Sequence, residues 1–177
     1  MIKALPSCDA KLLAQIDRSE VITQCYRLQG SELVAFAAPF DVPCWEREEL
    51  RQLIERNSAM RANGGSLLAY YLEEKLVGMV SLADKFLDQP SKYLVLDILY
   101  CSAQFRGRGV ATKLFAAALD EAKIRSARGL YISATPTINS VDFYLKRGCC
   151  ILAEPNPELF AKEPEDIHLG FLIAQQE

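Results

Sequence analysis

The sequence predicts an α/β (α+β) fold, in which a mixed, largely antiparallel central sheet is flanked by helices. Half of the 177 residues are hydrophobic, which is enough for one sizeable core. In the first half, apolar runs separated by short polar turns are typical of antiparallel hairpins. The second half alternates strand-like and helix-like periods, as in a strand–helix–strand–helix unit. We therefore expect residues 1–177 to form a single domain.

The first sixty residues predict a short helix, two short strands and a longer helix. Residues 8–20 place apolar side chains at helical spacing. Residues 21–38 indicate two strands around Gly30, and the segment "APFDVP" (38–43) is expected to break the second strand. Residues 44–63 carry an apolar stripe, with glutamates near the start of the helix, where its dipole favours negative charge.

The middle of the chain predicts a hairpin, a buried strand and an amphipathic helix. Residues 66–84 contain two apolar runs on either side of a charged turn, which is typical of a β-hairpin. The segment "YLVLDILYC" (93–101) is nearly continuously apolar, as in a strand buried on both faces. From Val110 the apolar residues follow a helical period, and this helix is expected to stop at Gly129.

The last fifty residues predict three more strands and one helix. Residues 130–134 form a short strand, and residues 135–148 start with proline and polar caps and end at a glycine, as a helix does. Residues 149–154 and 167–173 are the remaining strands, separated by a proline-rich loop.

Composition argues against several classes of protein. The formal charge is −3 and the isoelectric point about 5.3, so there is no overall basic excess for binding nucleic acid. No apolar run approaches the ~20 residues of a membrane-spanning helix, and the N-terminus lacks a signal-peptide pattern. We therefore expect no nucleic-acid or membrane partner and a cytoplasmic location.

The cysteine and histidine pattern predicts no metal site. None of the six cysteines forms a C-x-x-C pair, and His168 is the single histidine. A tetrahedral zinc site needs ligands that cluster more closely in sequence. Cys149 and Cys150 are either a redox pair or small core residues at the start of a strand.

The segment "QFRGRGVAT" (104–112) joins the buried strand to the amphipathic helix and has the properties of an anion site. A helix N-terminus carries unpaired amides and partial positive charge, and glycines allow a bound group to approach the backbone closely. Arg106 and Arg108 add charges that suit phosphate oxygens. These features predict a phosphate or pyrophosphate site.

Two nucleotide-binding motifs do not fit this segment, whereas one acyl-CoA motif does. The spacing of Gly107 and Gly109 matches neither the P-loop nor the dinucleotide pattern. The pattern [Q/R]-x-x-G-x-[G/A] is satisfied by Arg106-x-x-Gly109-x-Ala111. The segment resembles the acyl-CoA pyrophosphate loop of the GNAT superfamily of N-acetyltransferases. The segment "NSVDFYLKRGC" (139–149) resembles a second landmark of that family, and the resemblance covers roughly residues 60–175.

The resemblance implies a sheet that is splayed at the acyl-CoA site, with acetyl-CoA as acyl donor and no metal. Backbone amides of the strand that precedes the loop would bind the pantetheine arm, and amides of the loop would bind the pyrophosphate. The matching strand residues are Leu99, Tyr100 and Cys101. The matching loop residues are Arg106, Gly107, Arg108, Gly109, Val110, Ala111 and Thr112.

The resemblance assigns three further positions. Tyr144 matches the tyrosine that often protonates the departing CoA thiolate, and the alternative is a core aromatic. The family usually has a cofactor-contacting asparagine where this sequence has Thr137, and Asn139 follows two residues later. Either Thr137 or Asn139 contacts CoA, and Asn139 could instead cap the helix.

Asp97 is the candidate general base, because it is the single charged residue in "YLVLDILYC". A carboxylate in an apolar strand is costly unless it is paired, hydrogen-bonded or faces a cleft. Some family members carry a base on this strand at the position of Val95, and Asp97 shares its face because strand side chains alternate. Asp97 either handles the acceptor amine or bonds a neighbouring loop.

The predicted activity is transfer of an acetyl group to a primary amine of a small molecule or protein, by direct attack in a ternary complex. No cysteine lies where an acyl-enzyme is obvious. The alternatives are a non-catalytic acyl-CoA-binding or sensing domain and a nucleotide-binding protein. Glu46, Glu48 and Glu49 are compatible with a cationic acceptor or with a solvated helix face. Family members are often dimers, which leaves a homodimer open.

Overall fold

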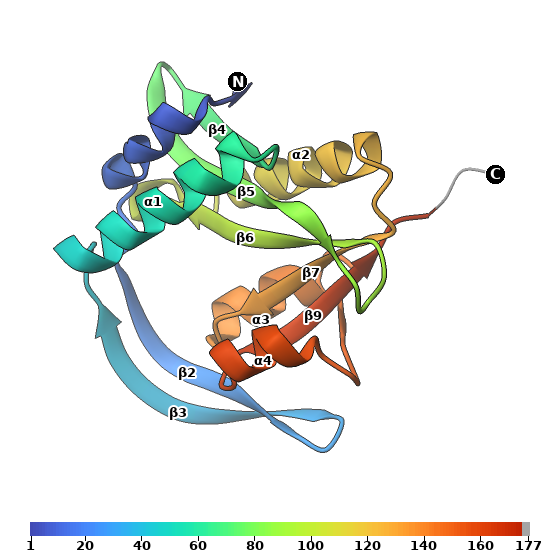
Figure 1. The fold of residues 1–177 in the computed structure, drawn as a ribbon. Coiled ribbons are helices and arrows are strands. Elements are labelled where there is room, and N and C mark those ends of the chain that lie inside the picture. The colour runs from blue at the N-terminus through green and yellow to red at the C-terminus, as the bar shows by residue number, and fades with distance from the viewer. Residues whose placement is uncertain (175–177) are drawn as a thin grey trace.

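The computed structural model describes residues 1–174 and is built around a seven-stranded sheet, in the order β1-β4-β5-β6-β7-β9-β8 (Figure 1). Every pair of neighbours is antiparallel except β6 and β7, which are parallel. This confirms the predicted mixed, largely antiparallel sheet. The strands are β1 (Ile2–Ala4), β4 (Ser66–Leu72), β5 (Lys75–Leu87), β6 (Tyr93–Cys101), β7 (Gly129–Ala134), β8 (Cys150–Ile151) and β9 (Ile167–Leu172).

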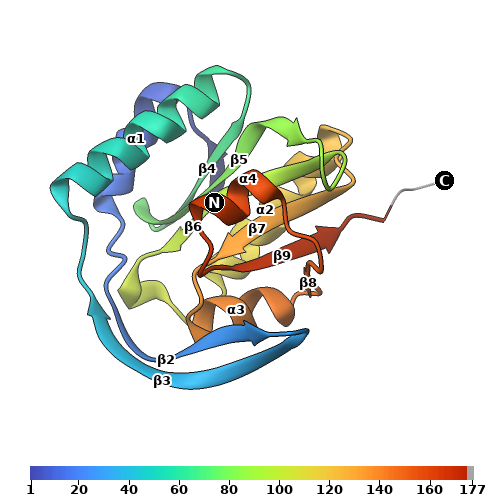
Figure 2. The ribbon, with the colours of Figure 1, turned by 60° about the horizontal axis from the view of Figure 1, so that its bottom comes forward.

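Helices cover both faces of the sheet and bury a separate apolar cluster on each (Figures 1 and 2). On one face lie the 3₁₀ helix η1 and helix α1, and on the other lie α2 and α3. None of the helices in residues 1–174 is long and apolar enough to cross a membrane. The helices are η1 (Ser7–Gln15), α1 (Arg47–Ala62), η2 (Ala103–Phe105), α2 (Val110–Ile124), α3 (Ile138–Leu145) and α4 (Pro157–Lys162).

The remaining strands, β2 (Glu20–Gln29) and β3 (Glu32–Val42), form a separate two-stranded sheet that curves past α3 (Figure 2). The expected break at residues 38–43 is wrong, because β3 continues through Pro39. The register of the pair shifts between Ile22 and Gln24, opposite this proline. A proline fits a strand at such a bulge, where no ladder hydrogen bond is needed.

Two C-terminal predictions also need correction. The expected strand at 149–154 is paired only over Cys150–Ile151. The expected loop at 155–164 contains helix α4, because the Asn156 side chain accepts hydrogen bonds from the amides of Glu158 and Leu159. Pro157 occupies the first turn, where its missing N–H costs nothing.

Strands β6 and β7 pair over only three residues and then diverge (Figure 1). The paired residues are Tyr93–Val95 and Gly129–Tyr131. Beyond them the β7-facing edge of β6 has no strand partner. The register of β5 against β6 also shifts, since Ser81 pairs with Ile98 and Leu82 with Leu96, which leaves Asp97 as the extra residue of a bulge. The divergence of β6 and β7 is where the sheet was predicted to be splayed.

Candidate functional site

A cavity of about 810 Å³ lies where β6 and β7 diverge, between the start of α2, helix α3 and the β2–β3 hairpin. It brings together residues that are distant in sequence, from Arg18 to Arg147. Every predicted site residue lines it except Arg108. Those that line it are Asp97, Leu99, Tyr100, Cys101, Arg106, Gly107, Gly109, Val110, Ala111, Thr112, Thr137, Asn139 and Tyr144.

The β6 strand offers backbone amides to this cavity at alternate residues. The amide of Ser102 donates to the carbonyl of Val77 on β5, which makes 102 and 77 a hydrogen-bonded pair. Since hydrogen-bonded and non-hydrogen-bonded pairs alternate, the amides of Leu99 and Cys101 face away from β5, toward the split. The amide of Tyr100 faces Met79 on β5, so the expected amide contact from Tyr100 is corrected.

The turn between β6 and α2 presents a row of unpaired amides. No backbone carbonyl in residues 1–174 accepts a hydrogen bond from the amides of residues 107–112. Gly107 and Gly109 have φ values of 73° and 77°, which only glycine adopts at little cost. Gly109 is the N-cap of α2, so the positive end of the helix dipole also points here. This geometry suits a pyrophosphate.

The two arginines of the turn contribute less than their charges suggest. The Arg106 guanidinium donates to the carbonyls of Arg18 and Ser19, each at 2.9 Å, and lies 3.7 Å from a carboxylate oxygen of Glu20. It therefore fastens the turn to the start of β2. Arg108 stacks over the ring of Phe105, with 5.6 Å between its Cζ and the ring centroid, and does not line the cavity.

A third arginine, which the sequence analysis missed, lines the cavity at this end. Arg147 lies 3.6 Å over the ring of Phe143, donates to its carbonyl and bonds the Thr112 hydroxyl at the start of α2. The i to i+4 spacing of Phe143 and Arg147 on a helix was a signal for this stacking. The contact with Thr112 spans thirty-five residues and has no local signal.

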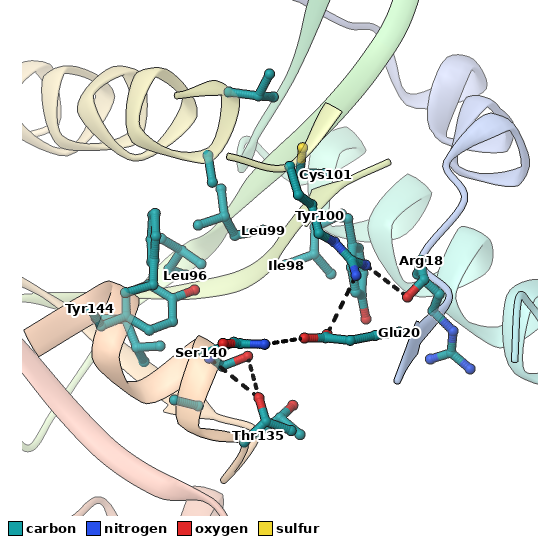
Figure 3. A pocket seen from close by; sticks show the side chains of 18 of the residues that line it. Arg18, Glu20, Leu96, Ile98, Leu99, Tyr100, Cys101, Thr135, Ser140 and Tyr144 are labelled. Atoms are coloured by element: carbon teal, nitrogen blue, oxygen red, sulfur yellow. Dashed lines mark hydrogen bonds and ion pairs between the residues drawn. The ribbon is translucent and has the colours of Figure 1, made fainter. Parts of the chain in front are cut away.

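Tyr144 reaches from α3 toward Leu96 and Leu99 of β6 (Figure 3). Its side chain is 8% exposed and packs edge-on against Phe115 and Phe143. Burial raises the pKa of the Tyr144 hydroxyl well above its usual value, so the group stays protonated at neutral pH. No hydrogen bond joins this hydroxyl to another group in residues 1–174, so its proton is available to a ligand.

Thr137 and Asn139 have local roles that the sequence left open. Thr137 is the N-cap of α3, because its Oγ1 accepts from the Ser140 amide at 3.3 Å, and the same oxygen donates to the Ser140 hydroxyl. The Thr137 hydroxyl is therefore bonded at the start of α3 in this structure. The suggestion that Asn139 caps the helix is wrong. The Asn139 amide instead donates to Glu20 at 2.8 Å, which ties α3 to β2.

Asp97 lies beside helix α1 at the edge of the cavity. One carboxylate oxygen, Oδ2, accepts from Arg56 Nε at 3.2 Å and from Asn57 Nδ2 at 3.3 Å. The side chain of Asp97 is 23% exposed and that of Arg56 is 57% exposed. The charge that was costly in an apolar strand is thus paired with a cation from another element, not with a loop.

Part of the cavity lining comes from the N-terminal elements, and these residues were not predicted. The three glutamates of the α1 start do not line it: Glu48 pairs with Arg51, and Glu49 pairs with Arg18. They are a solvated helix face, apart from the pair with Arg18. The N-terminal residues that line the cavity are Arg18, Glu20, Ile22, Phe40 and Val42.

The six cysteines of the chain are free thiols. Cys101 lines the cavity, and burial raises the pKa of its thiol, with partial opposition from Arg106. Burial raises the pKa of the Cys149 thiol to about 12, while Cys150 is exposed. The prediction that both Cys149 and Cys150 are core residues therefore holds only for Cys149. Raised pKa values disfavour the thiolates that a covalent or redox step would need.

Solved structures with similar folds are acetyltransferases. Nourseothricin acetyltransferase has a TM-score of 0.72 at 15% identity, with 97% of each chain covered. A Bacillus anthracis protein solved with acetyl coenzyme A has a TM-score of 0.69 at 18% identity, with 98% of this chain and 99% of that chain covered. Aminoglycoside 6′-acetyltransferase type Ii has a TM-score of 0.64 at 16% identity, with 100% and 99% covered.

Sequence comparison gives the family directly. No curated protein sequence matches this chain. The model of the acetyltransferase (GNAT) family matches residues 25–149, which is well over half of the chain. The matched region contains β6, the amide-rich turn, α2 and Tyr144. The protein described by this sequence and this cavity therefore belongs to the GNAT family of acetyltransferases.

Proposed function

We propose that this protein is an N-acetyltransferase of one domain, which moves an acetyl group from acetyl-CoA to a primary amine by direct attack in a ternary complex. The observation that carries the proposal is that one cavity combines three features. The unpaired amides of residues 107–112, the outward amides of Leu99 and Cys101, and the Tyr144 hydroxyl all belong to one cavity. Together they fit a pyrophosphate, a pantetheine arm and a departing thiolate.

In the proposed reaction, the neutral amine attacks the thioester carbonyl carbon. A C–N bond forms, the C–S bond breaks, and Tyr144 gives its proton to the CoA thiolate. A tyrosine hydroxyl carries its proton at neutral pH, so Tyr144 is in the form that this role requires, although burial raises its pKa and makes it a weaker acid. Asp97 accepts the proton that the amine loses. The raised pKa of the Cys101 thiol favours direct attack over an acyl-enzyme.

The acceptor is an amine that would approach the part of the cavity lined by Arg18, Glu20 and the β2–β3 hairpin. Two of the structural neighbours are a nourseothricin acetyltransferase and an aminoglycoside 6′-acetyltransferase, which makes such antibiotics reasonable members of a test panel. Free thiols fit a reducing compartment such as the cytoplasm.

A turnover screen tests the proposal. Purified protein is mixed with acetyl-CoA and with kanamycin, spermidine, lysine or tyramine, and released CoA thiol is measured. We expect thiol release with at least one amine, and no competition by ATP or NAD. Binding of acetyl-CoA without turnover of any amine would instead support the non-catalytic acyl-CoA-binding domain.

A further inference from the structure

Helix α1 contains a fully buried asparagine whose burial the apolar packing around it does not explain. Asn57 is 0% exposed and lies on the face of α1 that packs against the sheet, one turn after Leu53. Its Nδ2 donates to the Leu53 carbonyl at 3.0 Å and to Asp97 Oδ2 at 3.3 Å. Its Oδ1 is buried and has no partner in residues 1–174.

An unpaired buried amide oxygen lowers stability, so an apolar residue would serve the α1 interface better. Locally unfavourable residues of this kind are concentrated at functional sites. The asparagine contacts one residue of the cavity lining, Asp97. This contact is therefore the candidate reason for its presence.

The contacts of Asp97 are asymmetric between its two oxygens. Both donors from α1, Asn57 and Arg56, bond Oδ2, whereas no hydrogen bond joins Oδ1 to another group in the described part of the chain. Asp97 is also the bulged residue of β6, and bulges re-aim side chains. Asp97 lines the cavity, and of its two carboxylate oxygens Oδ1 is the one with free acceptor capacity in the described part of the chain.

Arg56 is a weaker support for the carboxylate than Asn57 is. Its guanidinium is more than half exposed, and exposed ion pairs are screened and pay rotamer entropy. Asn57 has no such freedom, because its amide is also bonded to the helix backbone. Of the two partners of Asp97, the uncharged Asn57 is thus the one that is held in place.

We propose that Asn57 is a positioning residue for the acetyl transfer, which holds Asp97 by Oδ2 and leaves Oδ1 to receive the acceptor amine. The inference rests on the proposed function, because Asp97 must handle the amine. Asn57 acts through Asp97 and does not touch the CoA half of the site, which is built by α2 on the opposite face of the sheet.

A double-mutant cycle with acetyl-CoA and the fastest amine of the panel tests this role. Asn57→Leu keeps the branched outline of the side chain and removes both the donor and the unpaired oxygen. We expect kcat to fall about 10- to 100-fold, as for a misplaced catalytic group, with KM for acetyl-CoA within about twofold. In the Asp97→Asn background, Asn57→Leu should cause no further loss, since coupled residues are not additive.

Two further variants control for folding. Ser81→Ala removes a buried hydroxyl that has no hydrogen-bond partner in residues 1–174, and so none in Asp97, and its kcat should stay within about twofold of the wild type. Asn57→Asp keeps the side-chain shape, but it places a like charge beside Oδ2, and it should lose at least as much rate as Asn57→Leu.

The outcomes separate this inference from the proposed function. If no amine is acetylated, the proposed function is wrong, and the inference that depends on it is wrong as well. If an amine is acetylated and Asp97→Asn is slow, but Asn57→Leu is as fast as the wild type or additive with Asp97→Asn, the positioning role alone is wrong.

Discussion

At the scale of single residues, burial keeps the hydroxyl of Tyr144, the proposed proton donor, in its neutral form. A phenol near its usual pKa would share its proton with solvent at alkaline pH. Packing against Phe115 and Phe143 removes water and raises the pKa of the Tyr144 hydroxyl. The neutral form is the proton donor, and it is lost only as pH rises through this raised pKa. The donor form therefore persists across the usual assay range.

Replacing Tyr144 with phenylalanine should lower kcat about 10²-fold or more, the usual contribution of a general acid, with little change in acetyl-CoA affinity. The ring is conserved in this variant, so the packing with Phe115 is retained. Steady-state kinetics on the panel amine and calorimetric titration of CoA provide the measurements. Unchanged kcat would show that Tyr144 is a core aromatic.

At the scale of elements, the β6–turn–α2 unit derives its binding capacity from backbone geometry. Left-handed glycines at 107 and 109 turn the chain so that the amides of residues 107–112 remain unpaired. Arg106 fastens this turn to the segment before β2, and Arg147 ties it to α3. The side chains thus hold the turn in shape, while the amides provide the anion site.

Gly109→Ala tests this view, with Gly30→Ala as its matched control. Both glycines have positive φ, 77° and 62°, and a Cβ added at either would meet no atom within 4 Å. Both variants should therefore lose about 1–2 kcal/mol of stability from left-handed strain. Only Gly109 lines the cavity, so only its variant should also weaken CoA binding, by about tenfold or more.

Thermal unfolding and CoA titration measure the two effects separately. Arg108→Ala should reduce CoA affinity less than Gly109→Ala does, because its side chain stacks on Phe105 outside the cavity. Equal CoA affinity in the Gly109 and Gly30 variants would contradict a backbone anion site at the turn.

At the scale of the whole molecule, distant parts of the chain line one cavity. The family-matched region contains β6, α2 and α3, which carry the residues proposed to bind the acyl donor. The hairpin of β2 and β3 is attached to α3 through Tyr26, whose amide donates to the Pro136 carbonyl at 2.7 Å and whose hydroxyl bonds Asp142. The other end of the sheet is held by a buried polar cluster around His168.

His168 should make stability depend on pH. Its Nδ1 lies 2.8 Å from the Tyr131 hydroxyl and its Nε2 lies 3.1 Å from the Glu163 carbonyl, so the neutral ring is fully bonded. Burial lowers the pKa of His168 below its usual 6.5, with partial opposition from Glu163. The unfolded chain therefore binds more protons below pH 6.5, and the free energy of unfolding should fall there as pH decreases.

The free energy of unfolding should fall by up to about 1.4 kcal/mol for each pH unit by which burial lowers the pKa of His168. Burial raises the pKa of the Asp166 carboxyl to about 6, which has the opposite effect on stability between pH 6 and 4. The measurement is therefore the difference in unfolding free energy between the wild type and His168→Gln from pH 8 to 5. This difference should shrink as pH falls, and a constant difference would refute the assignment.

The sequence predicted most of the strands and helices because their periods and caps are local. It failed where a local signal was overridden by position in the sheet. Pro39 was read as a break, yet it lies in a strand at a bulge. The segment expected to be a proline-rich loop contains helix α4, because the Asn156 side chain caps the N-terminus of this helix. For the site, the motif residues were found, whereas Asn57, Arg147 and Arg18 come from contacts over long sequence separations.

The sequence by itself determined the local geometry of the proposed donor site, since the glycines, the helix start and Tyr144 lie within segments whose local order specifies their geometry. Tertiary structure decided which atoms of those segments are free. The β5–β6 register turns the Tyr100 amide away from the cavity, and the Asn139 side chain donates a hydrogen bond to Glu20. The N-terminal part of the cavity lining was also decided by tertiary structure, because register, bulges and packing between distant elements depend on the whole chain.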